Sequence, residues 1–271
     1  MDIVQRNFLS LLRHGALSDD VLLEPMTEFK WKKVITLAKA LKTEDYVCNC
    51  LQSPTLLQSI PQNIVALIEK IDNESSQRKD KDSETDTPRL SNIFLNKLLD
   101  NIRDNEIHAI DTSTESLHLL DLIVLNCHYI LTFGISLRHL LQLGEYLRTQ
   151  GQRVDFVKID RWLQKLRLQR MAQFEGNLLV SLFQFEQDEI PFILSSDPNA
   201  DIYAAKLLRD LTFTDKTESL FKQGKSGLIQ GNTMATCRTI SRCMRFFSYS
   251  PIECVSNMIG RFVANLSEIE E

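Results

Sequence analysis

The stretch LHLLDLIVLNCHYIL, residues 117–131, carries apolar side chains at nearly every position around a helix. A helix that is apolar on all sides has to be surrounded by packing partners. Ser113 or Thr114 is suited to cap its start, because both are common at that position, and Glu115 would lie in the first turn. We therefore expect these residues to form a helix at the centre of the core.

Amphipathic patterns surround this central stretch on both sides. Apolar residues recur at helical spacing in each of them, and Pro251 suits the first turn of the last one. Gly15 is expected to end the first helix, and Gly134 to separate the central helix from the next. The predicted helices besides 117–131 cover residues 3–14, 29–41, 45–51, 62–71, 90–102, 135–147, a segment after Asp155, 171–185, 200–211, 231–247 and 251–266.

Glycine and proline are scarce, with 9 and 7 in 271 residues. Folds built of strands use these residues at their many turns, and no alternation of strands with helices is visible here. The prediction is an all-α fold, a multi-helix array without a substantial sheet.

Residues 72–87, DNESSQRKDKDSETDT, contain no hydrophobic side chain. Such a segment buries too little apolar surface to offset the entropy lost on ordering. We expect a flexible polar insertion over 72–89, between an N-terminal helical unit at 1–71 and a C-terminal helical domain at 90–271 that packs with the first.

The charge and the cysteines of the chain limit where the protein is expected to be located and what it is expected to bind. The chain has 31 basic and 36 acidic residues, for a net charge of −5. An acidic chain is a poor general binder of nucleic acid or anionic membranes, and the basic run 158–170 is expected to be a solvated helix face. None of the six cysteines forms a CxxC pair, and no segment has the pattern of a signal peptide or a membrane span. We expect a cytoplasmic protein that binds neither membranes nor nucleic acid.

Histidines in the central region are candidate metal ligands. His118 and Asp121 share a helical face, and His128 lies seven residues beyond Asp121 on roughly the same face. The spacing is loose, with no adjacent His-Asp doublet and no HExxH, so the alternative is that these polar groups satisfy one another or helix ends.

A second candidate site is the segment GISLRH, residues 134–139. Arg138 lies at a predicted helix start, where its guanidinium and free backbone N–H groups suit a phosphate or carboxylate, with Gly134 and His139 beside it. The alternative is that Arg138 joins neighbouring helices. The Gly-Lys-Ser-Gly sequence at 224–227 lacks the remaining features of a phosphate-binding loop and is predicted to be a plain loop.

Several segments together resemble one family, the bacterial uncharacterised nucleotidyltransferases. The similar segments are FLSLLRHGAL (8–17), the helix from Trp31 to Lys39, residues 118–147, Val154-Asp155 with the Trp162 helix, and RFFSYSPIECV (245–255). The resemblance implies a polymerase-β-like catalytic core flanked by helices. That core holds Mg²⁺ with a Gly-Ser turn followed by Asp-x-Asp and a third carboxylate.

The catalytic core of that family has no counterpart here. Asp-x-Asp occurs only as Asp80-Lys81-Asp82, inside the polar segment and without a preceding Gly-Ser. We therefore expect a non-catalytic binding or scaffold protein without a cofactor. Its expected partner is another protein, and a complete nucleotidyltransferase would fit that role. The alternative is a divergent enzyme, dependent on Mg²⁺ or on a metal near His118, Asp121, His128 and Arg138.

Overall fold

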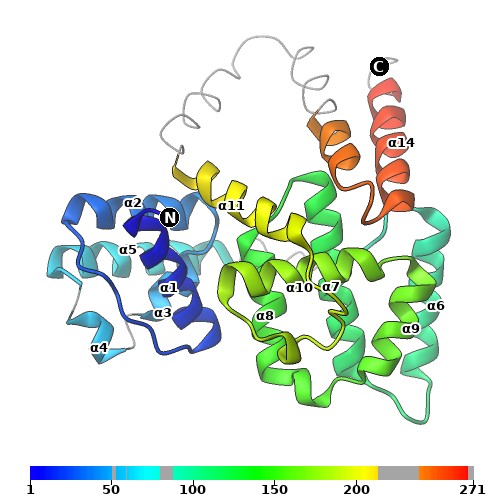
Figure 1. The fold of residues 1–271 in the computed structure, drawn as a ribbon, viewed down its shortest axis with the longest axis horizontal. Coiled ribbons are helices and arrows are strands. Elements are labelled where there is room, and N and C mark those ends of the chain that lie inside the picture. Colours follow the sequence, from blue (N-terminus) through cyan, green and yellow to red (C-terminus); the bar gives the residue numbers. More distant parts are fainter. Residues whose placement is uncertain (51–52, 59, 80–87, 213–237, 268–271) are drawn as a thin grey trace.

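The computed structural model describes residues 1–50, 53–58, 60–79, 88–212 and 238–267, and all regular secondary structure in this part is helical (Figure 1). The predicted all-α fold is confirmed. No helix in the described ranges combines the length and apolar character needed to cross a bilayer.

Helix α7 (Thr114–Thr132) lies at the centre of the larger group of helices. It contacts α6 (Ile93–Ile107), α8 (Leu137–Gln150), α9 (Phe156–Leu166), α10 (Gln169–Phe183) and α14 (Pro251–Ser267). Its side chains Leu119, Leu120, Ile123 and Val124 have no solvent exposure. The central position expected from residues 117–131 is therefore confirmed.

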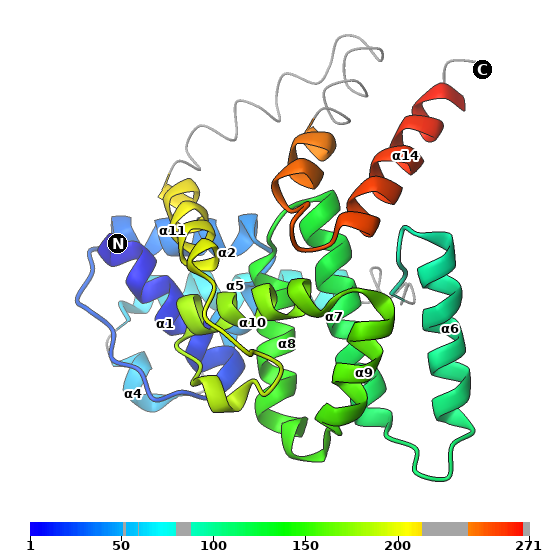
Figure 2. The same cartoon turned by 45° about the vertical axis from the view of Figure 1, so that its right-hand side comes forward.

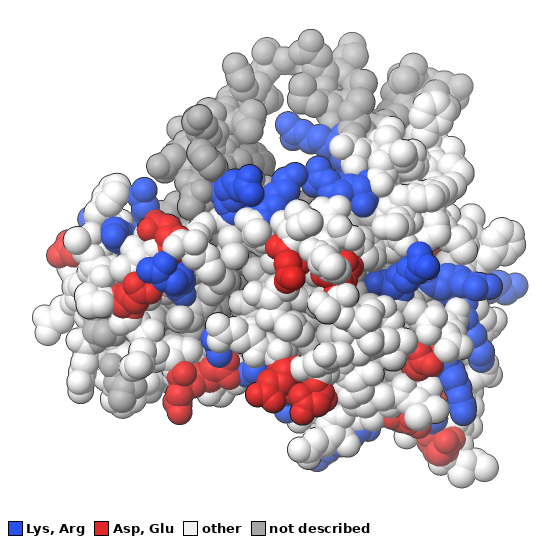
Figure 3. Space-filling view, viewed as in Figure 1, with Lys and Arg blue, Asp and Glu red and all other residues white. Residues whose placement is uncertain are grey.

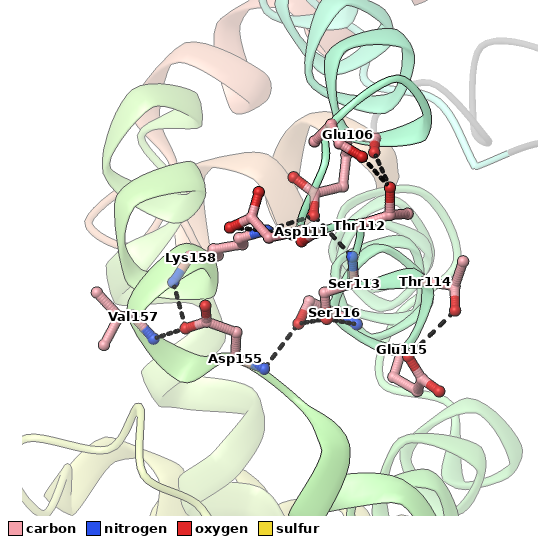
Figure 4. A network of polar contacts seen from close by, with 11 residues as sticks. Glu106, Asp111, Thr112, Ser113, Thr114, Glu115, Ser116, Asp155, Val157 and Lys158 are labelled. Atoms are coloured by element: carbon pink, nitrogen blue, oxygen red, sulfur yellow. Dashed lines mark hydrogen bonds and ion pairs between the residues drawn. The ribbon is translucent and has the colours of Figure 1, made fainter.

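Polar contacts hold the start of α7 against its neighbours (Figure 4). Ser113 caps the helix by accepting a hydrogen bond from the Ser116 backbone, and the Ser116 hydroxyl accepts another from the Asp155 N–H at 2.8 Å. Lys158 on α9 forms an ion pair with Glu106 on α6 at 2.6 Å. Lys158 therefore joins two helices, and only the later cations of the 158–170 run are exposed on the helix surface as predicted, namely Arg161, Lys165, Arg167 and Arg170.

The N-terminal helices are α1 (Ile3–Leu17), α2 (Glu28–Ala40), α3 (Glu44–Asn49), α4 (Pro54–Leu57) and α5 (Gln62–Lys79). Helix α1 packs on α2 and α3 and also on α8, α10 and α11 (Pro198–Thr212), as Figure 2 shows from a second side. The N-terminal helices are thus in direct contact with the rest of the chain.

Several predicted helix boundaries differ from the structure, as at α6 and α8, and the ends of α1 and α5 are two further cases. Helix α1 continues through Gly15 to Leu17 and ends at Ser18, which has φ 58°. Helix α5 continues past residue 71 to Lys79, so residues 72–79 of the polar segment are helical. A helix that has already begun propagates easily through Glu, Gln, Arg and Lys, even where nothing apolar is buried. Residues 80–87 lie outside the described part.

The C-terminal segments lie above α10 in Figure 1, where α11, the helical residues 238–245 and α14 follow one another. Pro251 begins α14, as predicted. The buried Glu253 carboxylate accepts hydrogen bonds from the backbone N–H groups of Ser91 at 2.6 Å and Asn92 at 3.1 Å. These bonds join α14 to the start of α6. Two short 3-10 helices, Gly151–Arg153 and Gln187–Glu189, complete the described elements.

Candidate functional site

An open cleft of about 680 Å³ lies between α11, residues 238–246 and the turn that follows α7. We call it the basic cleft because four of its lining residues are cations and none is acidic, among the residues that the structure describes. The lining residues are Phe133, Gly134, Ile135, Tyr203, Lys206, Leu207, Arg238, Ser241, Arg242, Arg245 and Phe246.

Three arginines reach the basic cleft from one face of one helix. Arg238, Arg242 and Arg245 are spaced by four and three residues, which places successive side chains on the same helical face. Lys206 contributes the fourth charge from α11 on the other wall. The helical spacing thus brings positive charges together in one place, although the chain as a whole has a net negative charge.

The cations of the basic cleft lie close enough together to influence the pKa of Arg242. Burial, together with the nearby Arg238, Arg261 and Arg245, lowers the pKa of Arg242. In the described part of the chain, no ion pair includes Lys206, Arg242 or Arg245. Arginine stays protonated at neutral pH despite such a shift, so the charges repel one another and favour an incoming anion.

Figure 3 shows the same asymmetry on the molecular surface. Lys and Arg side chains gather over α11 and the helical segment near it, whereas the larger groups of Asp and Glu lie lower on this face. Charges of one sign in a cleft raise the local concentration of counter-ions. The net charge of −5 is therefore a poor guide to this surface.

The walls of the basic cleft are held by buried contacts. The Arg242 guanidinium donates a hydrogen bond to the Thr132 carbonyl at the end of α7. Phe246 packs against Tyr203 with ring centroids 5.1 Å apart and against the buried Phe174 at 5.6 Å. These contacts fix the arginine-bearing helix relative to α7, α10 and α11.

Gly134 is the one predicted site residue that lines the basic cleft. It has φ 108°, a conformation that side chains with a Cβ rarely adopt, and its surroundings leave open space where a Cβ would be. The turn at Gly134 presents Phe133 to solvent with 66% of its surface exposed.

Arg138 and His139 lie outside the basic cleft. Arg138 pairs with Asp45 on α3 at 3.0 Å and also donates to the Lys42 carbonyl. His139 lies against the Tyr129 ring, with centroids 3.8 Å apart, and burial and the nearby Arg138 and Lys42 lower its pKa to about 4. The geometry at Arg138 therefore matches the alternative in which this residue joins two helices.

The candidate metal ligands are engaged separately. Asp121 pairs with Arg103 of α6, His118 lies against Tyr146 of α8, and the half-buried His128 lies near Tyr129. Among the described residues, no three His, Cys, Asp or Glu side chains are arranged to hold a metal ion. Sharing a helical face did not bring these groups together, because each of them meets a different neighbour.

The arginine stripe of the basic cleft was not identified from the sequence. Its signal was present as Arg-x-x-x-Arg-x-x-Arg within the predicted helix 231–247. Lys206 and Phe133, in contrast, join the cleft only through the packing of α11 and α7. Residues 224–227 lie outside the described part.

Comparisons with protein-family models, with curated proteins and with solved structures return no match for this chain. The resemblance to nucleotidyltransferases therefore stays a prediction from the sequence.

Proposed function

We propose that this protein is a non-catalytic binding protein that holds an anionic ligand in the basic cleft. The observation that carries the proposal is the set of Lys206, Arg242 and Arg245, which converge on one cleft without a described carboxylate partner. Guanidinium groups bind phosphate and carboxylate oxygens through paired hydrogen bonds, so two of them on one helix face, with the Lys206 ammonium on the other wall, suit a ligand with several negative charges.

The expected protein partner and cytoplasmic location remain part of this proposal. An acidic or phosphorylated segment of another protein is one ligand of the required charge. The five described cysteines are buried and form no disulfide with one another, which is typical of proteins in a reducing compartment. The proposal includes no cofactor.

Inorganic polyphosphate is a suitable probe, because it carries negative charge without any further recognition element. We expect the wild-type protein to bind it, and Arg245→Glu to weaken the affinity at least about tenfold, equal to about 1.4 kcal/mol. Arg245 is an appropriate target because its side chain is exposed.

Lys32→Glu is the matched control for this titration. Lys32 is exposed on α2, away from the basic cleft, and its replacement changes the net charge by the same amount. We expect this variant to bind polyphosphate like the wild type. Equal losses in both variants would show that net charge alone governs binding, and the proposal would then be wrong.

A further inference from the structure

The positive surface extends beyond the space of a single small anion. A helix rises 1.5 Å per residue, so the stripe from Arg238 to Arg245 is about 10 Å long. Arg261 on α14 adds its charge near Arg242, and Arg170 on α10 donates to the Ser248 carbonyl just beyond Arg245. The backbone of a nucleic-acid strand carries one negative charge at each phosphate, so a stripe of this length can face more than one phosphate.

An exposed aromatic ring lies in the same cleft. Phe133 is 66% exposed, and the Tyr129 ring supports it with a centroid distance of 5.3 Å. The half-buried Tyr203 lines the opposite wall. Large apolar side chains that remain exposed beside cations are the arrangement on which unpaired bases stack, whereas an acidic peptide has no need of a free ring face.

We propose, building on the proposed anion-binding function, that the ligand of the basic cleft is a single strand of nucleic acid. Its phosphates lie along Arg242, Arg245 and Lys206, and one of its bases stacks on Phe133. A single strand fits better than a duplex, because paired bases are already stacked within their helix and present no free face to Phe133. The expectation that this acidic chain binds no nucleic acid rested on its net charge. The basic cleft is locally positive, so the net charge does not describe it.

The test measures fluorescence anisotropy of labelled single-stranded RNA and DNA oligonucleotides about 12 nucleotides long, a length within the usual range of such sites. Polyphosphate, a duplex of the same sequence and a poly-glutamate peptide of matched length serve as competitors. We expect the single strands to bind more tightly than any of the three competitors. Phe133→Leu keeps an apolar side chain but removes the ring, and should weaken single-strand binding at least about fivefold, a larger loss than it causes in polyphosphate binding.

The outcomes separate this inference from the proposed function. If polyphosphate binds in an Arg245-dependent way but single strands bind no better than duplex or polyphosphate, the inference is overturned and the anion site stands. Preference for poly-glutamate, or single-strand binding that Phe133→Leu leaves unchanged, also overturns it. If neither single strands nor polyphosphate bind, both proposals are wrong.

Discussion

Glu175 on α10 is a buried carboxyl group that no described residue partners. Its side chain has no solvent exposure, and neither carboxylate oxygen has a hydrogen-bond partner among the described residues. Burial raises the pKa of Glu175 well above its ordinary value. The carboxyl group therefore stays protonated in the folded protein under conditions that ionise it in the unfolded chain.

Replacement of Glu175 by methionine should stabilise the protein in a pH-dependent way. Because the folded pKa is raised, the wild type loses stability as pH rises from the ordinary glutamate pKa towards the folded one. We expect Glu175→Met to raise the free energy of unfolding by about 1–3 kcal/mol at about pH 8 and by less at about pH 5. Urea unfolding at both pH values measures this difference, and an equal gain at the two would contradict it.

Gly15 permits the close contact between α1 and α3. A Cβ at this position would lie 1.8 Å from the Tyr46 carbonyl oxygen. Because this oxygen is part of the backbone, it cannot move away by rotation of a side chain. We expect Gly15→Ala to destabilise the protein by at least about 2 kcal/mol, despite the better helix propensity of alanine.

Gly260 on α14 is the control for Gly15. Nothing lies within 4 Å of the point where a Cβ would stand on Gly260, so only helix propensity distinguishes glycine from alanine there. Gly260→Ala should stabilise the protein by about 0.5–1 kcal/mol in thermal or urea unfolding. Opposite signs for the two variants are the expected result, and the same sign would refute the steric explanation for Gly15.

At the scale of elements, local sequence patterns predicted most of the helices but not the contacts between them. The cap at Ser113, the helix that follows Asp155 and the start at Pro251 follow from local chemistry and lie where expected. The end of α1 was misplaced because Gly15 serves a contact with Tyr46, which is distant in sequence. The same limit applies to the candidate site, where Gly134 was identified but its neighbours on α11 were not.

The ion pair between Arg138 and Asp45 joins α8 to α3, and its side chains are only 28% and 18% exposed. We expect Arg138→Met to lower the free energy of unfolding by about 1 kcal/mol, and to leave polyphosphate affinity at the wild-type value. Urea unfolding and a polyphosphate titration check the two parts. A loss of affinity as large as that of Arg245→Glu would instead place the ligand at Arg138.

At the scale of the whole molecule, the distribution of charge matters more for ligand binding than the net charge does. Composition gave a net charge of −5 and argued against nucleic acid as a partner. The fold brings Lys206 on α11 next to the arginines of residues 238–245, so a positive region forms on an acidic protein. The relative placement of helices so far apart in the chain does not follow from helical periodicity, which describes each helix separately.

The salt dependence of polyphosphate binding tests the anion site most directly. Ion release makes the logarithm of the affinity fall linearly with the logarithm of salt concentration, by about 0.7 per phosphate contacted in a flexible chain. Three or four contacts predict a slope of about −2 to −3 for the wild type. Loss of one contact in Arg245→Glu should make the slope less steep by about 0.7. A slope near zero, or one that Arg245→Glu leaves unchanged, would contradict an anion site in the basic cleft.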